Sequence, residues 1–133
     1  MKKCVNIIFM NDEHMEAFFL FMKQARVNDC YTQSLLYLLA MDSGTRANIN
    51  RLYDFEANRI KFDGLCEAWQ SHSSLDATRM AFNLFNGFHG FGWEDGRGET
   101  ELDCPSEYTP YGLFHRLDYQ PYYFQAIRLR YPS

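Results

Sequence analysis

The sequence lacks the cysteine and glycine motifs that would assign a chemistry to it. It has four cysteines, and no two of them are close enough to form the C-x-x-C pair of a zinc knuckle. No glycine-rich segment leads into the lysine and serine of a phosphate-binding loop. We therefore expect no metal and no cofactor, and we expect the cysteines to be free thiols.

Long apolar runs are also missing. The N-terminal run Cys4–Met10 is short, is interrupted by Asn6, and is followed by Asp12 and Glu13, which is not the pattern of a signal peptide. No run approaches the length that crosses a membrane. The sequence therefore predicts a cytoplasmic protein that does not contact a membrane.

Positive charge is scarce, and this argues against nucleic acid as the partner. Lysines and arginines number 13 against 17 aspartates and glutamates, which gives a net charge of −4. Residues 94–107 contain six of the acids and only Arg97 to balance them, a local charge of −5 that leaves +1 elsewhere. No direct nucleic-acid binding through a broad basic surface is expected. A local acidic patch suits a basic protein partner, a cation or simple solvation.

Hydrophobic and aromatic side chains are abundant. They make up 47% and 17% of the 133 residues, with 12 phenylalanines and 9 tyrosines. This length and composition predict one folded domain over residues 1–133. A small core does not need so many rings, so we expect some on the surface, where large apolar patches usually mark binding sites.

Helical periodicity predicts an all-α bundle of five or six short helices, with a short strand or extended arm over Cys4–Met10. The first helix is expected to begin at Asn11 or Asp12. Its core face has the spacing i, i+3, i+4, i+7 and consists of Met15, Phe18, Phe19 and Met22. Leu20 and Phe21 fall outside this stripe, so the helix is either central in the bundle or in contact with a partner.

The middle helices are shorter. A second helix is expected to start at Asp29 or Thr32 and to end at Gly44, in the manner of a C-terminal glycine. Thr45 is expected to cap a third helix, and Asp63 to begin a short fourth one.

The last two helices have the clearest boundaries. The fifth is expected to start in the run Ser71–Ser74 and to stop at Asn86–Gly87. Asp118 is expected to cap the final helix, with Pro121 in its first turn, where the missing N–H costs nothing.

Residues 87–112 lie between these helices and have no periodicity. An unstructured loop of this length inside a compact domain is uncommon, and it is usually either functional or disordered. Disorder normally goes with few aromatics, whereas this segment contains five: Phe88, Phe91, Trp93, Tyr108 and Tyr111. The long Gly/acidic/aromatic loop is therefore the best candidate for a working surface.

The loop also contains residues of the types that form catalytic sites. His89 lies near Cys104 and several acids, so a Cys–His nucleophile pair or a His–carboxylate acid–base pair forms an alternative site. No family signature surrounds Cys104, and the glycines near His89 leave its position unfixed. The carboxylates of residues 95–103 lack the pattern of a calcium loop and would repel phosphate. Recognition is favoured over reaction.

The remaining histidines are interpreted as structural. His14 lies in the first turn of the first helix and His72 precedes the fifth, so both are expected to be surface or capping residues. His115, near Asp118, is interpreted as part of the turn into the last helix.

Three blocks of sequence carry a resemblance to a known family: residues 9–18 (FMNDEHMEAF), the helical positions within 52–87, and residues 124–131 (FQAIRLRY). Together they resemble an uncharacterised domain family of short proteins from phages and mobile elements of Gram-positive bacteria. The resemblance implies a setting and no catalytic residues. Small phage proteins without enzyme motifs often bind a host protein, and anti-CRISPR-type inhibition of a defence nuclease is one such outcome, by analogy.

The leading hypothesis is a non-catalytic interaction protein that binds a host or defence-system protein, such as a nucleic-acid-handling effector with a basic channel. Its expected binding residues are aromatic anchors and acids of the loop: Phe91, Trp93, Glu94, Asp95, Glu99, Glu101, Asp103 and Tyr111. Two alternatives stay open. One is a small enzyme or ligand-binding domain that uses His89 and loop carboxylates, and the other is a structural homo-oligomer joined through the first two helices.

Overall fold

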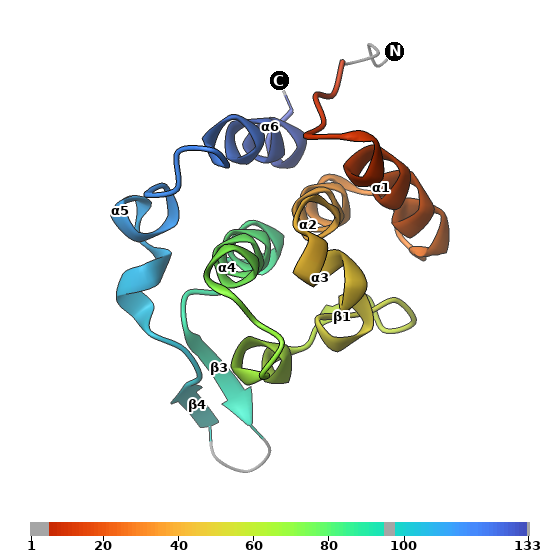
Figure 1. Ribbon diagram of the computed structural model, residues 1–133. Coiled ribbons are helices and arrows are strands. Elements are labelled where there is room, and N and C mark those ends of the chain that lie inside the picture. Colours follow the sequence, from red (N-terminus) through yellow and green to blue (C-terminus); the bar gives the residue numbers. More distant parts are fainter. Residues whose placement is uncertain (1–5, 95–97, 133) are drawn as a thin grey trace.

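The fold is known from a computed structural model, in which residues 6–94 and 98–132 are described. Most of these residues are helical (Figure 1). The α-helices in this part of the chain are α1 (Asp12–Gln24), α2 (Cys30–Met41), α3 (Ser43–Ala47), α4 (His72–Asn86), α5 (Pro110–Leu113) and α6 (Gln120–Arg130).

Two small antiparallel hairpins and three short 3-10 helices complete the described structure. The strands are β1 (Tyr53–Asp54), β2 (Arg59–Ile60), β3 (Phe91–Glu94) and β4 (Gly98–Glu101). The 3-10 helices are η1 (Ile49–Arg51), η2 (Phe62–Cys66) and η3 (Pro105–Tyr108). The protein is therefore mostly helical, and the expectation of a purely α-helical bundle is wrong in this respect.

The 87–112 segment is the main difference from the expected fold. It is not one long loop, because it contains β3, β4, η3 and the start of α5. Each strand is only four residues long, and glycine occupies one or more of its positions. Alternation over so short a stretch is a weak signal, so the sequence pattern alone did not indicate a hairpin. At the other end of the chain, residues 6–10 form no strand.

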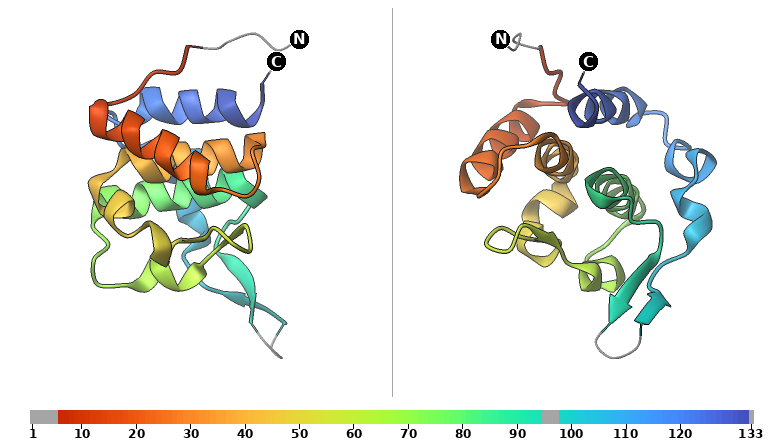
Figure 2. Two further views of the ribbon diagram at one scale, coloured as in Figure 1. Left: turned by 90° about the vertical axis from the view of Figure 1, so that its right-hand side faces the viewer. Right: turned by 180° about the vertical axis from the view of Figure 1, so that it is seen from behind.

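The centre of the core is α2. Every residue from Leu35 to Met41 is buried, and α2 packs against α1, α4 and α6, which surround it in Figures 1 and 2. A helix that is covered on all sides needs apolar residues on all sides, which explains why this segment has no polar stripe. The arrangement leaves α1 and α6 at the outside of the bundle, each with one face toward solvent.

The buried face of α1 differs from the expected one. It consists of His14, Ala17, Phe18 and Phe21. Met15, Phe19 and Leu20 are exposed. The sequence interpretation left His14 out of the core face and assigned it to the first turn as a surface or capping residue, so the expected face is rotated by about one residue around the helix axis.

His14 is fully buried, so its interpretation as a surface or capping residue is wrong. Asn11 is the cap, because its side chain accepts a hydrogen bond from the backbone N–H of His14 at 2.8 Å. His14 Nδ1 accepts from the backbone N–H of Met10 at 3.0 Å, and Nε2 donates to the carbonyl oxygen of Tyr37 at 2.8 Å. Burial lowers the pKa of His14 to about 4. The neutral imidazole therefore fastens the N-terminal arm to α1 and α2.

The boundary between α2 and α3 is set by an aspartate. Asp42 leaves the helical conformation, and its carboxylate accepts hydrogen bonds from the backbone N–H groups of Gly44 and Thr45 at 2.8 and 3.3 Å. Asp42 therefore caps the third helix, where Thr45 was expected, and Gly44 lies inside α3 and does not terminate α2. The other carboxylate oxygen of Asp42 accepts from the Tyr119 hydroxyl at 2.7 Å, which fixes the start of α6 to the core.

The boundaries of α4 are confirmed. Ser71 caps its N-terminus together with Ser74, and Gly87 ends it in the left-handed conformation with φ of 81°. In α6, Pro121 lies in the first turn as expected, but Tyr119 and not Asp118 occupies the cap position. Within the described ranges, no helix is both long enough and apolar enough to cross a membrane.

Candidate functional site

The β3–β4 hairpin contains most of the residues that the sequence nominated for binding. Its strands pair in antiparallel register, with Phe91 opposite Glu101 and Trp93 opposite Glu99. Because successive residues of a strand alternate between the two faces of a sheet, positions 91, 93, 99 and 101 all belong to one face. Folding therefore gathers two aromatic and two acidic positions that are separated along the chain. We call these four positions the hairpin face.

The opposite face of the hairpin packs against the domain. A Cβ on Gly92 would lie 2.6 Å from the Leu102 side chain and 3.5 Å from the Phe62 ring. The hairpin face is therefore directed away from the core, and Figure 2 shows the strands extending beyond the helices. Glu99 and Glu101 are exposed, and Phe91 is half-buried.

The nominated binding residues do not all belong to the described part of the hairpin. Asp95 lies outside the described residues, and so do the side chains of Trp93 and Glu94, whose backbone belongs to β3. Phe91 lies beside the His89 ring, with the ring centroids 5.6 Å apart. Tyr111 does not belong to the hairpin. It lies in α5 and is 92% exposed there.

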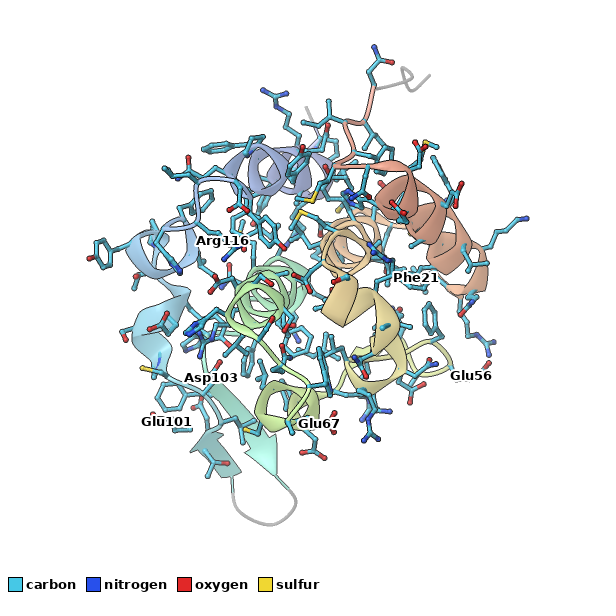
Figure 3. The ribbon with its side chains drawn as sticks, in the orientation of Figure 1. Phe21, Glu56, Glu67, Glu101, Asp103 and Arg116 are labelled. Atoms are coloured by element: carbon cyan, nitrogen blue, oxygen red, sulfur yellow. The ribbon has the colours of Figure 1, made fainter. Side chains whose placement is uncertain are left out.

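Asp103 has an internal role. Its two carboxylate oxygens accept hydrogen bonds from Arg79 Nε at 2.9 Å and Arg79 Nη2 at 3.0 Å, and Tyr108 donates a third at 2.6 Å. Burial opposes the ionisation of Asp103, but the bonds from Arg79 and Tyr108 outweigh it and hold the pKa of this carboxyl below its usual range. The ion pair joins the base of the hairpin to α4. Asp103 is labelled in Figure 3.

The turn that leads into β3 is held by backbone contacts. Gly90 has a φ of 105°, and its carbonyl oxygen accepts hydrogen bonds from the N–H groups of Leu102 and Asp103 at 2.6 and 3.1 Å. A Cβ at Gly90 would lie 2.7 Å from the Asp103 carbonyl oxygen. The hairpin is therefore fixed at its base by Gly90 and by the Arg79–Asp103 ion pair.

A groove of about 910 Å³ lies beside this base, between α4, η3 and α5. One wall is a single face of α4, formed by residues with helical spacing: His72, Leu75, Asp76 and Arg79. Glu107 and Ser106 of η3 and Phe114 beyond α5 form the other wall, with Tyr111 at its edge. No pattern in the sequence predicts this groove, because residues of α4 and α5 that line it are more than 20 residues apart along the chain.

An acid–base pair, Asp76 and His115, lines this groove. Nδ1 of His115 lies 2.6 Å from the carbonyl oxygen of Gly112 and must carry a proton, because a carbonyl only accepts. Nε2 lies 3.3 Å from Asp76 Oδ2, and this contact is attractive only when Nε2 or the carboxyl is protonated. Burial raises the pKa of Asp76, and the positive charges of Arg116 and Arg79 act against this shift. The groove thus contains a close contact between a carboxyl and an imidazole side chain that sequence reasoning missed.

The structure does not join His89 to Cys104. His89 is exposed, and its Nδ1 lies 3.2 Å from the Gly87 carbonyl oxygen. Cys104 is also exposed, and its Sγ lies 3.2 Å from Ser106 Oγ. No contact recorded for the described residues forms a nucleophile–base pair between them. Nowhere in residues 6–94 and 98–132 do three or more His, Cys, Asp or Glu side chains come together in a group that could hold a metal ion.

These features define a mostly helical protein with a projecting acidic and aromatic hairpin and an adjacent polar groove. The chain belongs to DUF6075, a family of unknown function whose model matches residues 4–133. This agrees with the resemblance to an uncharacterised family. No curated protein matches the chain, and no solved structure matches it.

Proposed function

We propose that this protein is a non-catalytic binding protein that uses the hairpin face to recognise a partner protein with a basic surface. The observation that supports this proposal is the register of β3 and β4, which assigns positions 91, 93, 99 and 101 to the strand face opposite to Gly92, and Glu99 and Glu101 are exposed on it. Aromatic anchors with surrounding charge are typical of protein interfaces.

The anchoring of the hairpin supports the same proposal. Binding costs less when the surface is already ordered, because less conformational freedom is lost. The Arg79–Asp103 ion pair and the Gly90 turn supply this order at the base of the hairpin. Asp103 is used for this purpose, so we leave it out of the binding surface, and we assign Tyr111 to the rim of the neighbouring groove.

The biological setting of the proposal comes from the resemblance to phage and mobile-element proteins. In that setting the partner is a host or defence-system protein, and an effector with a basic nucleic-acid channel is the kind that the exposed Glu99 and Glu101 fit best. Anti-CRISPR-type inhibition is one form that such binding takes.

Affinity capture with matched variants tests the proposal. The binding variant combines Phe91→Ala, Glu99→Lys and Glu101→Lys. The control combines Glu56→Lys and Asp118→Lys, two exposed acids remote from the hairpin in sequence. We expect the unmodified protein and the control to capture the same host protein from lysate, and the binding variant to lose it. Equal capture by all three would contradict the proposal.

The groove supports a second candidate function, the binding of a small ligand. Asp76 is buried, and its Oδ2 lies 3.3 Å from His115 Nε2 but accepts no hydrogen bond among the described residues, so an N–H group of a ligand is the donor that it suits. A shift of the melting temperature by small amines, present in the unmodified protein and lost in Asp76→Asn, would favour this function. No shift with any amine would exclude it.

A further inference from the structure

The outward face of α1 exposes two large hydrophobic side chains to solvent. Glu16, Phe19, Leu20 and Lys23 have the spacing i, i+3, i+4, i+7 and therefore form one stripe along the helix. The stripe lies opposite the buried face of α1. All four side chains are exposed, with Phe19 at 53% and Leu20 at 54%.

The surface around this stripe is hollowed on both sides of Leu20. One hollow is lined by Phe19, Leu20, Met22 and Lys23. The other is lined by Glu13, Glu16, Ala17, Leu20, Phe21 and Arg46. A ridge with a hollow on each side is the shape into which the side chains of a second helix pack.

The charges of the stripe identify the second helix. Glu16 and Lys23 are placed symmetrically about the midpoint between Phe19 and Leu20, and they carry opposite charges. When such a helix pairs with an antiparallel copy of itself about that midpoint, each Glu16 meets a Lys23 and each Phe19 meets a Leu20. A parallel pairing in register would instead place Glu16 against Glu16.

We propose that two copies of this protein associate through α1 helices that pack antiparallel about a two-fold axis between Phe19 and Leu20. Two Glu16–Lys23 pairs flank an apolar centre in this arrangement. Among the described residues, neither Glu16 nor Lys23 forms an ion pair within its own chain. The interface is separate from the hairpin face, because it uses α1 and the neighbouring Arg46 of α3.

Charge reversal tests this arrangement, because a non-specific apolar contact would not depend on the signs of the charges at positions 16 and 23. Glu16→Lys leaves only positive charge on the stripe, and Lys23→Glu leaves only negative charge. We expect sedimentation velocity to show a dimer for the unmodified protein and monomers for each single variant. The double variant Glu16→Lys/Lys23→Glu restores both pairs and the dimer.

Mixing the two single variants gives the sharpest outcome. Each is monomeric alone, but together they place opposite charges at both pairs, so we expect a one-to-one heterodimer. Glu101→Lys on the hairpin serves as the control and stays dimeric. Far-UV circular dichroism verifies that every variant is folded. The proposal is overturned if the unmodified protein is monomeric up to about 1 mM, a concentration that reveals even weak association, or if the mixture stays monomeric.

Discussion

Acidification provides a quantitative test of the buried His14. Its Nδ1 accepts a hydrogen bond from the Met10 N–H and its Nε2–H donates to the Tyr37 carbonyl, so the folded state uses the neutral ring. Adding a proton to Nδ1 would set two donors against each other in a site without water access. Protonation is therefore expected to occur more easily in the unfolded chain than in the folded one.

The magnitude follows from the two pKa values. The pKa of His14 is lowered from 6.5 to about 4 by burial, so between these values the unfolded state binds one proton that the folded state does not. The free energy of unfolding should fall by about 1.4 kcal/mol per pH unit over this window, or about 3 kcal/mol in all. The contribution is fully present above pH 6.5 and is lost as the pH falls toward 4.

The assay is urea unfolding followed by circular dichroism at several pH values between 7 and 4, for the unmodified protein and for His14→Gln. Glutamine has no titration in this range, so the difference between the two curves isolates His14 from the carboxyl groups. We expect the difference to shrink as the pH falls. Parallel curves would refute the assignment of a neutral buried imidazole.

Three further changes test the base of the hairpin and its neighbours. Asp103→Asn removes the charge that pairs with the half-buried Arg79, which keeps Glu107 as a second carboxylate partner, and we expect a loss of about 2 kcal/mol in urea unfolding at pH 7. The pKa of Asp103 is lowered, so its contribution is present above the ordinary aspartate pKa and disappears as the pH falls through the folded value; Asp103→Asn should remove this acid dependence. Gly87→Ala meets no atom within 4 Å and should cost only about 1 kcal/mol for its positive φ, whereas Gly90→Ala also meets the Asp103 carbonyl oxygen and should cost at least about 2 kcal/mol by the same measurement. Equal losses for the two glycine variants would contradict the backbone contact at Gly90.

The helical part of the fold was largely predictable from the sequence. Positions of α1, α2, α4 and α6 follow from apolar periodicity, and Gly87 marks the end of α4 through the left-handed conformation that glycine adopts without strain. The face that each helix buries was harder to predict. The burial of His14 depends on the Tyr37 carbonyl, which is 23 residues away along the chain, and local spacing contains no information about that contact.

The candidate site was predictable in composition but not in arrangement. Counting charges and rings located the 87–112 segment, but the roles of its residues depend on partners from other elements. Asp103 looks like its acidic neighbours in sequence, and only the approach of Arg79 from α4 makes it structural. The Asp76–His115 pair likewise depends on the packing of α5 against α4, which no short-range pattern specifies.

Site-specific photo-crosslinking from the hairpin tests the proposed function most directly. A photoreactive amino acid at position 99 lies on the hairpin face, and one at position 56 lies on the β1–β2 hairpin as a matched control. In host lysate we expect the photoreactive residue at position 99 to crosslink to one host protein and give one abundant adduct. This adduct should disappear when Glu101→Lys is added, and the residue at position 56 should give no adduct. A captured partner that crosslinks from position 56 and not from position 99 would show that recognition occurs elsewhere on the molecule.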